Sequence, residues 1–155
     1  MKFNTASQVI SFARKLEEDG IDFYESMAKR YTEDSDILLG FARENKKNIT
    51  RVERAYYGVI SDAIEGCFTF DLDPEEFAIK PEDLQHPAGS NSINTAIEME
   101  SQTARFYDKA AEQSKSLLAD VPRAFSTMVK LRDDRRKKLA SLRDTGNLAE
   151  QPEPR

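Results

Sequence analysis

The sequence predicts an all-α fold, a four-helix bundle made of two antiparallel helical hairpins joined by a long connection. Three observations support this prediction. Four segments carry apolar residues with helical period, and no stretch has the alternating pattern of a substantial strand. The first and last pairs of segments are joined by short connections, whereas about 25 residues separate the second from the third.

The first hairpin is expected to contain helices over about Thr5–Arg30 and about Ser35–Glu65. The polar run 31–34 interrupts the period between them, and Gly66 is a typical stop. The apolar stripe of the first helix is Val9, Phe12, Ala13, Leu16, Gly20, Phe23 and Met27. The stripe of the second is Leu38, Phe41, Ile49, Val52, Ala55, Tyr56 and Val59.

The second hairpin is expected to contain helices over about Ser92–Lys115 and about Asp120–Thr145, with Asp120 as the N-cap of the latter. Residues 67–91 hold three prolines and a glycine, so we expect a connection there rather than a long helix. One domain is expected over residues 1–145, followed by a disordered tail at 146–155.

Composition excludes several classes of protein. The net charge of −5 and the lack of a long Lys/Arg tract argue against a nucleic-acid-binding surface. A single cysteine, Cys67, excludes an intramolecular disulfide framework and a CxxC metal knuckle. The sequence shows no signal-peptide pattern and no apolar run of membrane-spanning length, so we expect a cytoplasmic protein without membrane contact.

The two halves of the chain resemble each other. At a shift of 83 residues the third helix repeats the first, so that Glu17 matches Glu100 and Tyr24 matches Tyr107. The second and fourth helices align less firmly, at a shift of 90. The sequence therefore indicates an internal repeat, in which each half is one copy of a helical hairpin.

Six polar residues fall on the inward stripes near the middle of each helix. The three-four spacing of a bundle seam places inside the residues Glu17, Asn45, Asn48, Glu100, Arg135 and Lys138. Two carboxylates and two cations cancel, and the asparagines can donate and accept hydrogen bonds. We therefore predict a buried polar layer that neutralises itself, because an unpaired buried charge is costly.

These stretches resemble the rubrerythrin-like branch of the ferritin-like superfamily. EMESQTARFYDKAA (98–111) is similar to that family's third helix, KLEEDGIDFYESMA (15–28) to its first and LLGFARENKKNITRVE (38–53) to its second. The resemblance covers about residues 5–145 and implies a ferritin-like bundle with a long 2–3 crossover and a di-iron centre. It places Glu17 and Glu100 at the bridging carboxylates, with Tyr24 and Tyr107 hydrogen-bonding them.

The sequence departs from the family at the remaining ligands. The Glu-x-x-His of the second helix is replaced by Asn45 and Asn48, and that of the fourth by Arg135 and Lys138, or by Arg132 and Arg135 if the fourth helix is slipped by three residues. Asparagine is a weak donor and cations repel M²⁺, so we expect no metal cofactor and no catalysis. The prediction is a non-catalytic scaffold or interaction module that has lost its di-iron centre. The resemblance implies a homodimer, and an unidentified protein partner is compatible with the role.

The alternative is a rubrerythrin-like oxidase or peroxidase that binds iron through shifted ligands. Its metal would be held by Glu17, Glu100 and a recruited Glu44. Against it, Glu44 lies about 100° around its helix from the inward stripe, where acid is ordinarily solvated. The single histidine, His86, falls in the proline-rich connection, where a surface role is expected.

Overall fold

The chain folds as an all-helical bundle in a computed structural model that describes residues 2–59, 70–78, 92–114 and 120–144. Its four helices are α1 (Ala6–Arg30), α2 (Ser35–Val59), α5 (Ser92–Gln113) and α6 (Asp120–Asp144). Two short 3-10 turns accompany them, η1 (Thr32–Asp34) and η2 (Pro74–Glu76). Among the described residues the one β pairing is an isolated bridge between Phe3 and Leu72.

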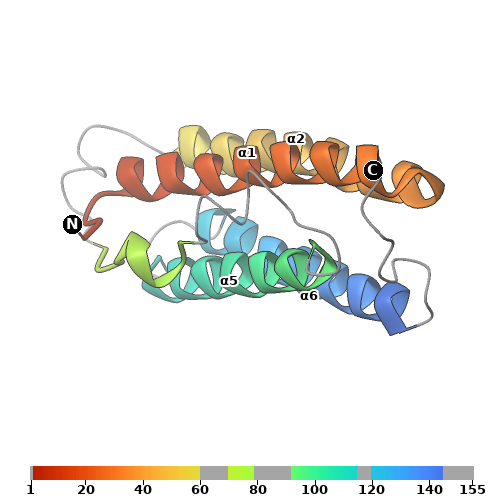
Figure 1. Ribbon diagram of the computed structural model, residues 1–155. Coiled ribbons are helices and arrows are strands. Elements are labelled where there is room, and N and C mark those ends of the chain that lie inside the picture. The colour runs from red at the N-terminus through yellow and green to blue at the C-terminus, as the bar shows by residue number, and fades with distance from the viewer. Residues whose placement is uncertain (1, 60–69, 79–91, 115–119, 145–155) are drawn as a thin grey trace.

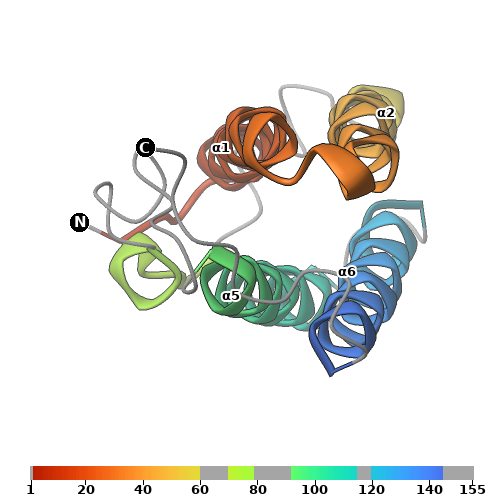
Figure 2. The same cartoon turned by 45° about the vertical axis from the view of Figure 1, so that its right-hand side comes forward.

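The helices form two layers, α1 with α2 and α5 with α6 (Figure 1). Within each layer the two helices run in opposite directions. The layers meet where α6 packs on α2 and α5 packs on α1, which the view along the bundle shows (Figure 2). No helix in the described part of the chain has the length and apolar character needed to cross a bilayer.

A capping box starts α1. The Thr5 hydroxyl accepts a hydrogen bond from the Gln8 backbone N–H at 3.2 Å, and the Gln8 side chain accepts one from the Thr5 N–H at 3.2 Å. Lys29 and Arg30 lie in the last turn, where cations interact favourably with the helix dipole. The helix therefore begins one residue after the predicted start and ends at the predicted residue.

The other helix boundaries agree with the sequence pattern over the described residues. α5 starts at Ser92, as predicted, and ends two residues before the predicted Lys115. α6 includes Asp120 as its first residue, whereas the sequence pattern placed that residue just outside the helix. Residues 60–65 of the predicted second helix, His86, Cys67 and the tail at 146–155 lie outside the described residues.

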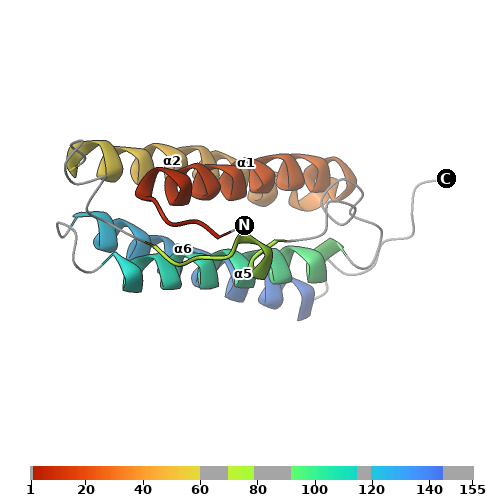
Figure 3. The same cartoon turned by 90° about the vertical axis from the view of Figure 1, so that its left-hand side faces the viewer.

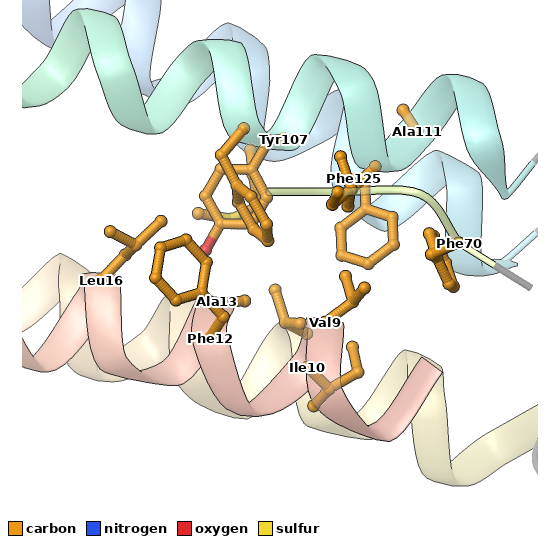
Figure 4. Close-up of a cluster of buried hydrophobic side chains, with 14 of the residues drawn as sticks. Val9, Ile10, Phe12, Ala13, Leu16, Phe70, Tyr107, Ala111 and Phe125 are labelled. Carbon is orange, nitrogen blue, oxygen red and sulfur yellow. The ribbon is translucent and has the colours of Figure 1, made fainter. Parts of the chain in front are cut away.

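The hydrophobic core consists of two clusters, one toward each end of the bundle. The first joins the early part of α1 to the late part of α5, and Figure 4 shows Val9, Phe12 and Leu16 of α1 directed toward Tyr107 and Phe125. The second joins the late part of α1 to the early parts of α2 and α5, around Phe23 and Leu38. Apart from Gly20, the buried residues between the two clusters are polar on every helix, so the bundle has a polar layer across its middle.

Part of the 67–91 connection belongs to the core, which its sequence pattern did not indicate. Phe70, Leu72 and Phe77 are buried, and the Phe77 ring lies edge-on to Phe106 at 5.6 Å. The N-terminal segment and η2 lie along the side of the bundle formed by α1 and α5 (Figure 3). This side is therefore covered by chain that follows no helical period.

Candidate functional site

The polar layer is fully buried and draws on all four helices. Each of its members keeps at most 3% of its surface exposed. Those from α1 and α5 are acids, those from α2 are amides and those from α6 are guanidinium groups. The members are Glu17, Asn45, Asn48, Glu100, Arg132 and Arg135.

Each carboxylate of the layer is held by a tyrosine from the opposite hairpin. The Tyr24 hydroxyl of α1 donates to Glu100 Oε1 of α5 at 2.5 Å. The Tyr107 hydroxyl of α5 donates to Glu17 Oε1 of α1 at 2.8 Å. The sequence repeat at a shift of 83 thus becomes a reciprocal pair of hydrogen bonds, in which matching residues exchange partners across the layer.

Arg132 of α6 lies between the two carboxylates and contacts both. Its Nη1 donates to Glu100 Oε1 at 2.8 Å and to Glu100 Oε2 at 2.7 Å. Its Nη2 donates to Glu17 Oε2. A planar guanidinium presents several fixed donors, so one side chain can neutralise two acids at once.

Arg135 extends the network from the layer toward the surface. Its Nη1 donates to Asn45 Oδ1 at 2.5 Å and to Glu100 Oε1 at 3.2 Å, and its Nη2 donates to Glu44 Oε1 at 2.8 Å. The guanidinium also lies over the Phe41 ring, 4.9 Å from its centroid. Arg135 therefore shares its charge between a buried acid and one that water reaches.

The structure differs from the sequence prediction at α6. The prediction that Lys138 lies in the layer is wrong, because Lys138 is exposed and its Nζ is 6.0 Å from the centre of the Phe41 ring. The slipped register is the one observed, with Arg132 and Arg135 inside. The buried series on this helix is Val121, Phe125, Met128, Arg132, Arg135 and Leu139, whose alternating steps of four and three keep one face inward.

Glu44 and Asn48 also have partners that spacing alone did not indicate. The Glu44 side chain is 42% exposed, in line with the expectation of a solvated acid, but it also pairs with Arg135. Asn48 is buried as expected and accepts a hydrogen bond from Arg51 Nη1 at 3.0 Å. The remaining predicted members, Glu17, Asn45 and Glu100, lie in the layer as predicted.

The two buried acids differ in how far their charges are compensated. Burial raises the pKa of Glu17 above its usual value, since Arg132 and the Tyr107 hydroxyl offset only part of the desolvation. Burial acts on Glu100 in the same sense, but Arg132 and Arg135 together hold the pKa of Glu100 below its usual value. Desolvation is also the main reason why the pKa values of Tyr24 and Tyr107 lie well above the usual value, so both hydroxyls remain donors at neutral pH.

These opposite shifts predict that the contribution of the two acids to stability first rises and then falls on acidification. Between the raised pKa of Glu17 and the usual value of 4.5, the folded state binds more protons than the unfolded chain, so stability increases as the pH falls. Below 4.5 the lowered pKa of Glu100 reverses the sign, and stability is lost. As the pH falls from neutral to 4, the urea midpoint of the wild type is expected to rise relative to the urea midpoint of E17Q. A constant difference between the two proteins would contradict the raised pKa of Glu17.

Gly20 gives the layer the space that Asn45 occupies. The residue is buried in α1, and a methyl group there would overlap with Asn45 Nδ2. Asn45 Nδ2 is also 3.4 Å from the Glu17 carbonyl oxygen, so it has little room to move. Only glycine leaves this approach between α1 and α2 open.

We therefore expect Gly20→Ala to destabilise the protein by about 1–3 kcal/mol, the usual result of overpacking. Gly40→Ala is the matched control, because a methyl group at position 40 meets only the flexible end of Arg43 at 3.7 Å. In the control the higher helix propensity of alanine should stabilise the protein by up to about 1 kcal/mol. Equal free energies of unfolding for the two variants, measured in urea, would show that Gly20 has no packing role.

The chemistry of the layer suits internal ion pairing better than metal ligation. The carboxylate oxygens of Glu17 and Glu100 already accept hydrogen bonds from guanidinium and phenol groups, and the guanidinium between them carries the charge that a cation would bring. Within the described residues no group of three or more His, Cys, Asp or Glu side chains is placed to hold a metal ion.

Comparisons of the chain with protein-family models, with curated proteins and with solved structures find no match in any of the three.

Proposed function

We propose that the chain is a rubrerythrin-like member of the ferritin-like superfamily in which a salt-bridge layer has replaced the di-iron centre. In this proposal the protein acts as a non-catalytic scaffold or interaction module. The observation that carries it is the position of Arg132, whose guanidinium donates to both carboxylates that the resemblance assigns to the metal. In this proposal the positive charge of Arg132 compensates the two carboxylates as the metal would, without the reactivity of the metal.

Two further features support the ferritin-like assignment. α2 ends at one end of the bundle and α5 begins at the other, an arrangement that a long 2–3 crossover would produce (Figure 1). The tyrosine that hydrogen-bonds each carboxylate is in keeping with the support that the resemblance implies for the bridging ligands. The homodimer implied by the resemblance belongs to the same proposal and is tested by light scattering of the purified protein.

The residues of the layer do not fit a di-iron group. Such a centre needs anionic oxygen donors and imidazoles on α2 and α6, and those positions hold Asn45, Asn48, Arg132 and Arg135. The competing proposal is an oxidoreductase that binds iron through Glu17, Glu44 and Glu100. Its one supporting observation is that Glu44 reaches the edge of the layer, although it does so as the ion-pair partner of Arg135.

Metal titration distinguishes the two proposals. We expect the purified protein to contain well under one metal per chain, and Fe(II), Mn(II) and Zn(II) to leave its thermal midpoint unchanged, because the carboxylates are already paired. Binding of about two metals per chain, the number in a di-iron site, would overturn the scaffold proposal. Peroxide-driven oxidation of Fe(II) that is lost in E17Q would establish the oxidoreductase in its place.

A further inference from the structure

One outward-facing stripe of α2 combines unpaired cations with exposed apolar side chains. It consists of Leu39, Arg43, Lys47, Thr50, Arg54 and Tyr57, called here the α2 stripe, and all six residues are exposed. At 100° per residue they fall within an arc of about 80°, and they extend over about 27 Å of helix. The stripe is therefore a straight, narrow surface on one helix.

The apolar residues at its two ends set this stripe apart from an ordinary solvated face. Leu39 and Tyr57, exposed to 36% and 67%, are the large hydrophobic side chains that the described part of the chain leaves exposed. Both lie on this stripe, one at each end. The Tyr57 ring also packs against the Tyr56 ring, with centroids 5.2 Å apart.

The cations between these ends have no acidic partner within the described residues. Arg43, Lys47 and Arg54 make no ion pair there, whereas the exposed Arg14, Lys15 and Lys46 are all paired with acids. A chain with a net charge of −5 thus presents a local face of the opposite sign.

We propose that the α2 stripe is a docking surface for an acidic amphipathic helix of a partner protein. Glutamates or aspartates of that helix would face Arg43, Lys47 and Arg54, and its apolar residues would cover Leu39 and Tyr57. A second copy of this chain does not fit, because a twofold contact along the stripe sets Arg43 against Arg54 of the other copy. The stripe lies apart from the buried layer, so its role stands whether or not the layer binds metal.

Fluorescence anisotropy with a labelled synthetic peptide tests this assignment. The probe is a helical peptide with a leucine near each end and glutamates between them on the same face, at the spacing of the stripe. We expect the folded full chain to bind it, with affinity falling as salt rises from about 50 to about 300 mM. R43E/R54E and L39S/Y57S should each weaken binding by about tenfold or more. The control K29E/R105E, which makes the same charge change on exposed residues of α1 and α5, should change affinity by less than about twofold.

Several outcomes would overturn the assignment. Binding of the peptide by R43E/R54E with the affinity of the wild type would show that the stripe is not the binding surface. Equal binding of a probe whose leucines are replaced by serine would show that charge attraction alone accounts for the binding. Duplex DNA or phosphatidylserine vesicles that bind more tightly than the peptide would identify a different class of partner. A dimer that dissociates in R43E/R54E would mean that the stripe contacts a second copy. Circular dichroism confirms that each variant is folded before it is used.

Discussion

Arg132→Ala is expected to destabilise the folded protein by about 3–5 kcal/mol, the usual effect of removing one partner from a buried ion pair. The substitution leaves Glu17 and Glu100 facing each other without the guanidinium that contacts both. It also opens a cavity where one of the largest fully buried side chains was packed. Urea denaturation followed by circular dichroism measures the loss.

Two companion variants separate the charge effect from general damage to α6. Arg136→Ala removes a more exposed arginine of the same helix, whose partner is Asp133, and should change stability by less than about 0.5 kcal/mol. The triple variant E17Q/E100Q/R132M removes both acids together with the cation between them and leaves Arg135 paired with Glu44, so it should recover part of the lost stability. If the triple variant is as unstable as Arg132→Ala, packing rather than charge explains the effect.

Glu100→Ala should destabilise the protein by a similar amount, about 3–5 kcal/mol, because it removes the buried acid that two guanidinium groups share. Glu100 accepts hydrogen bonds from Tyr24, Arg132 and Arg135. Glu17 accepts from one arginine and one tyrosine, so Glu17→Ala should have the smaller effect. The same denaturation experiment ranks the two, and a change below about 0.5 kcal/mol for Glu100→Ala would contradict the ion-pair layer.

The polar layer could be predicted from spacing because the helices that carry it keep a regular seam. Glu17 and Glu100 occupy inward positions of strongly periodic helices, so a reading of the apolar residues around them is enough to place both inside. Asn45 and Asn48 follow in the same way from Phe41 and Val52 on α2. What spacing cannot supply is the pairing itself, since it does not show which cation reaches which acid.

The register of α6 could not be fixed from the sequence for a specific reason. Leu131 and Leu142 are apolar but only half-buried, and they compete with Arg132 for the inward stripe in any pattern based on hydrophobicity. Large cations are rarely fully buried, so the pattern favours the leucines. The spacing of Phe125, Met128 and Leu139 did contain the correct register, because Arg132 and Arg135 complete their series.

The core contribution of residues 70–78 could not be predicted for a different reason. Its stabilising contacts join segments that are distant in sequence, as in the pairing of Phe3 with Leu72 and the contact of Phe77 with Phe106. A short extended segment without period carries no local signal for such contacts. The same holds for the α2 stripe, whose significance depends on which cations the fold leaves unpaired.

The exchange of partners between Tyr24 and Glu100, and between Tyr107 and Glu17, makes each hairpin incomplete without the other. In an isolated α1–α2 hairpin, Glu17 would lose both its phenol and its guanidinium, which come from α5 and α6. The α5–α6 hairpin would in turn keep Arg132 but lose the second acid that this arginine neutralises. The two halves are thus thermodynamically interdependent, and the chain is expected to unfold in a single cooperative transition rather than one hairpin at a time.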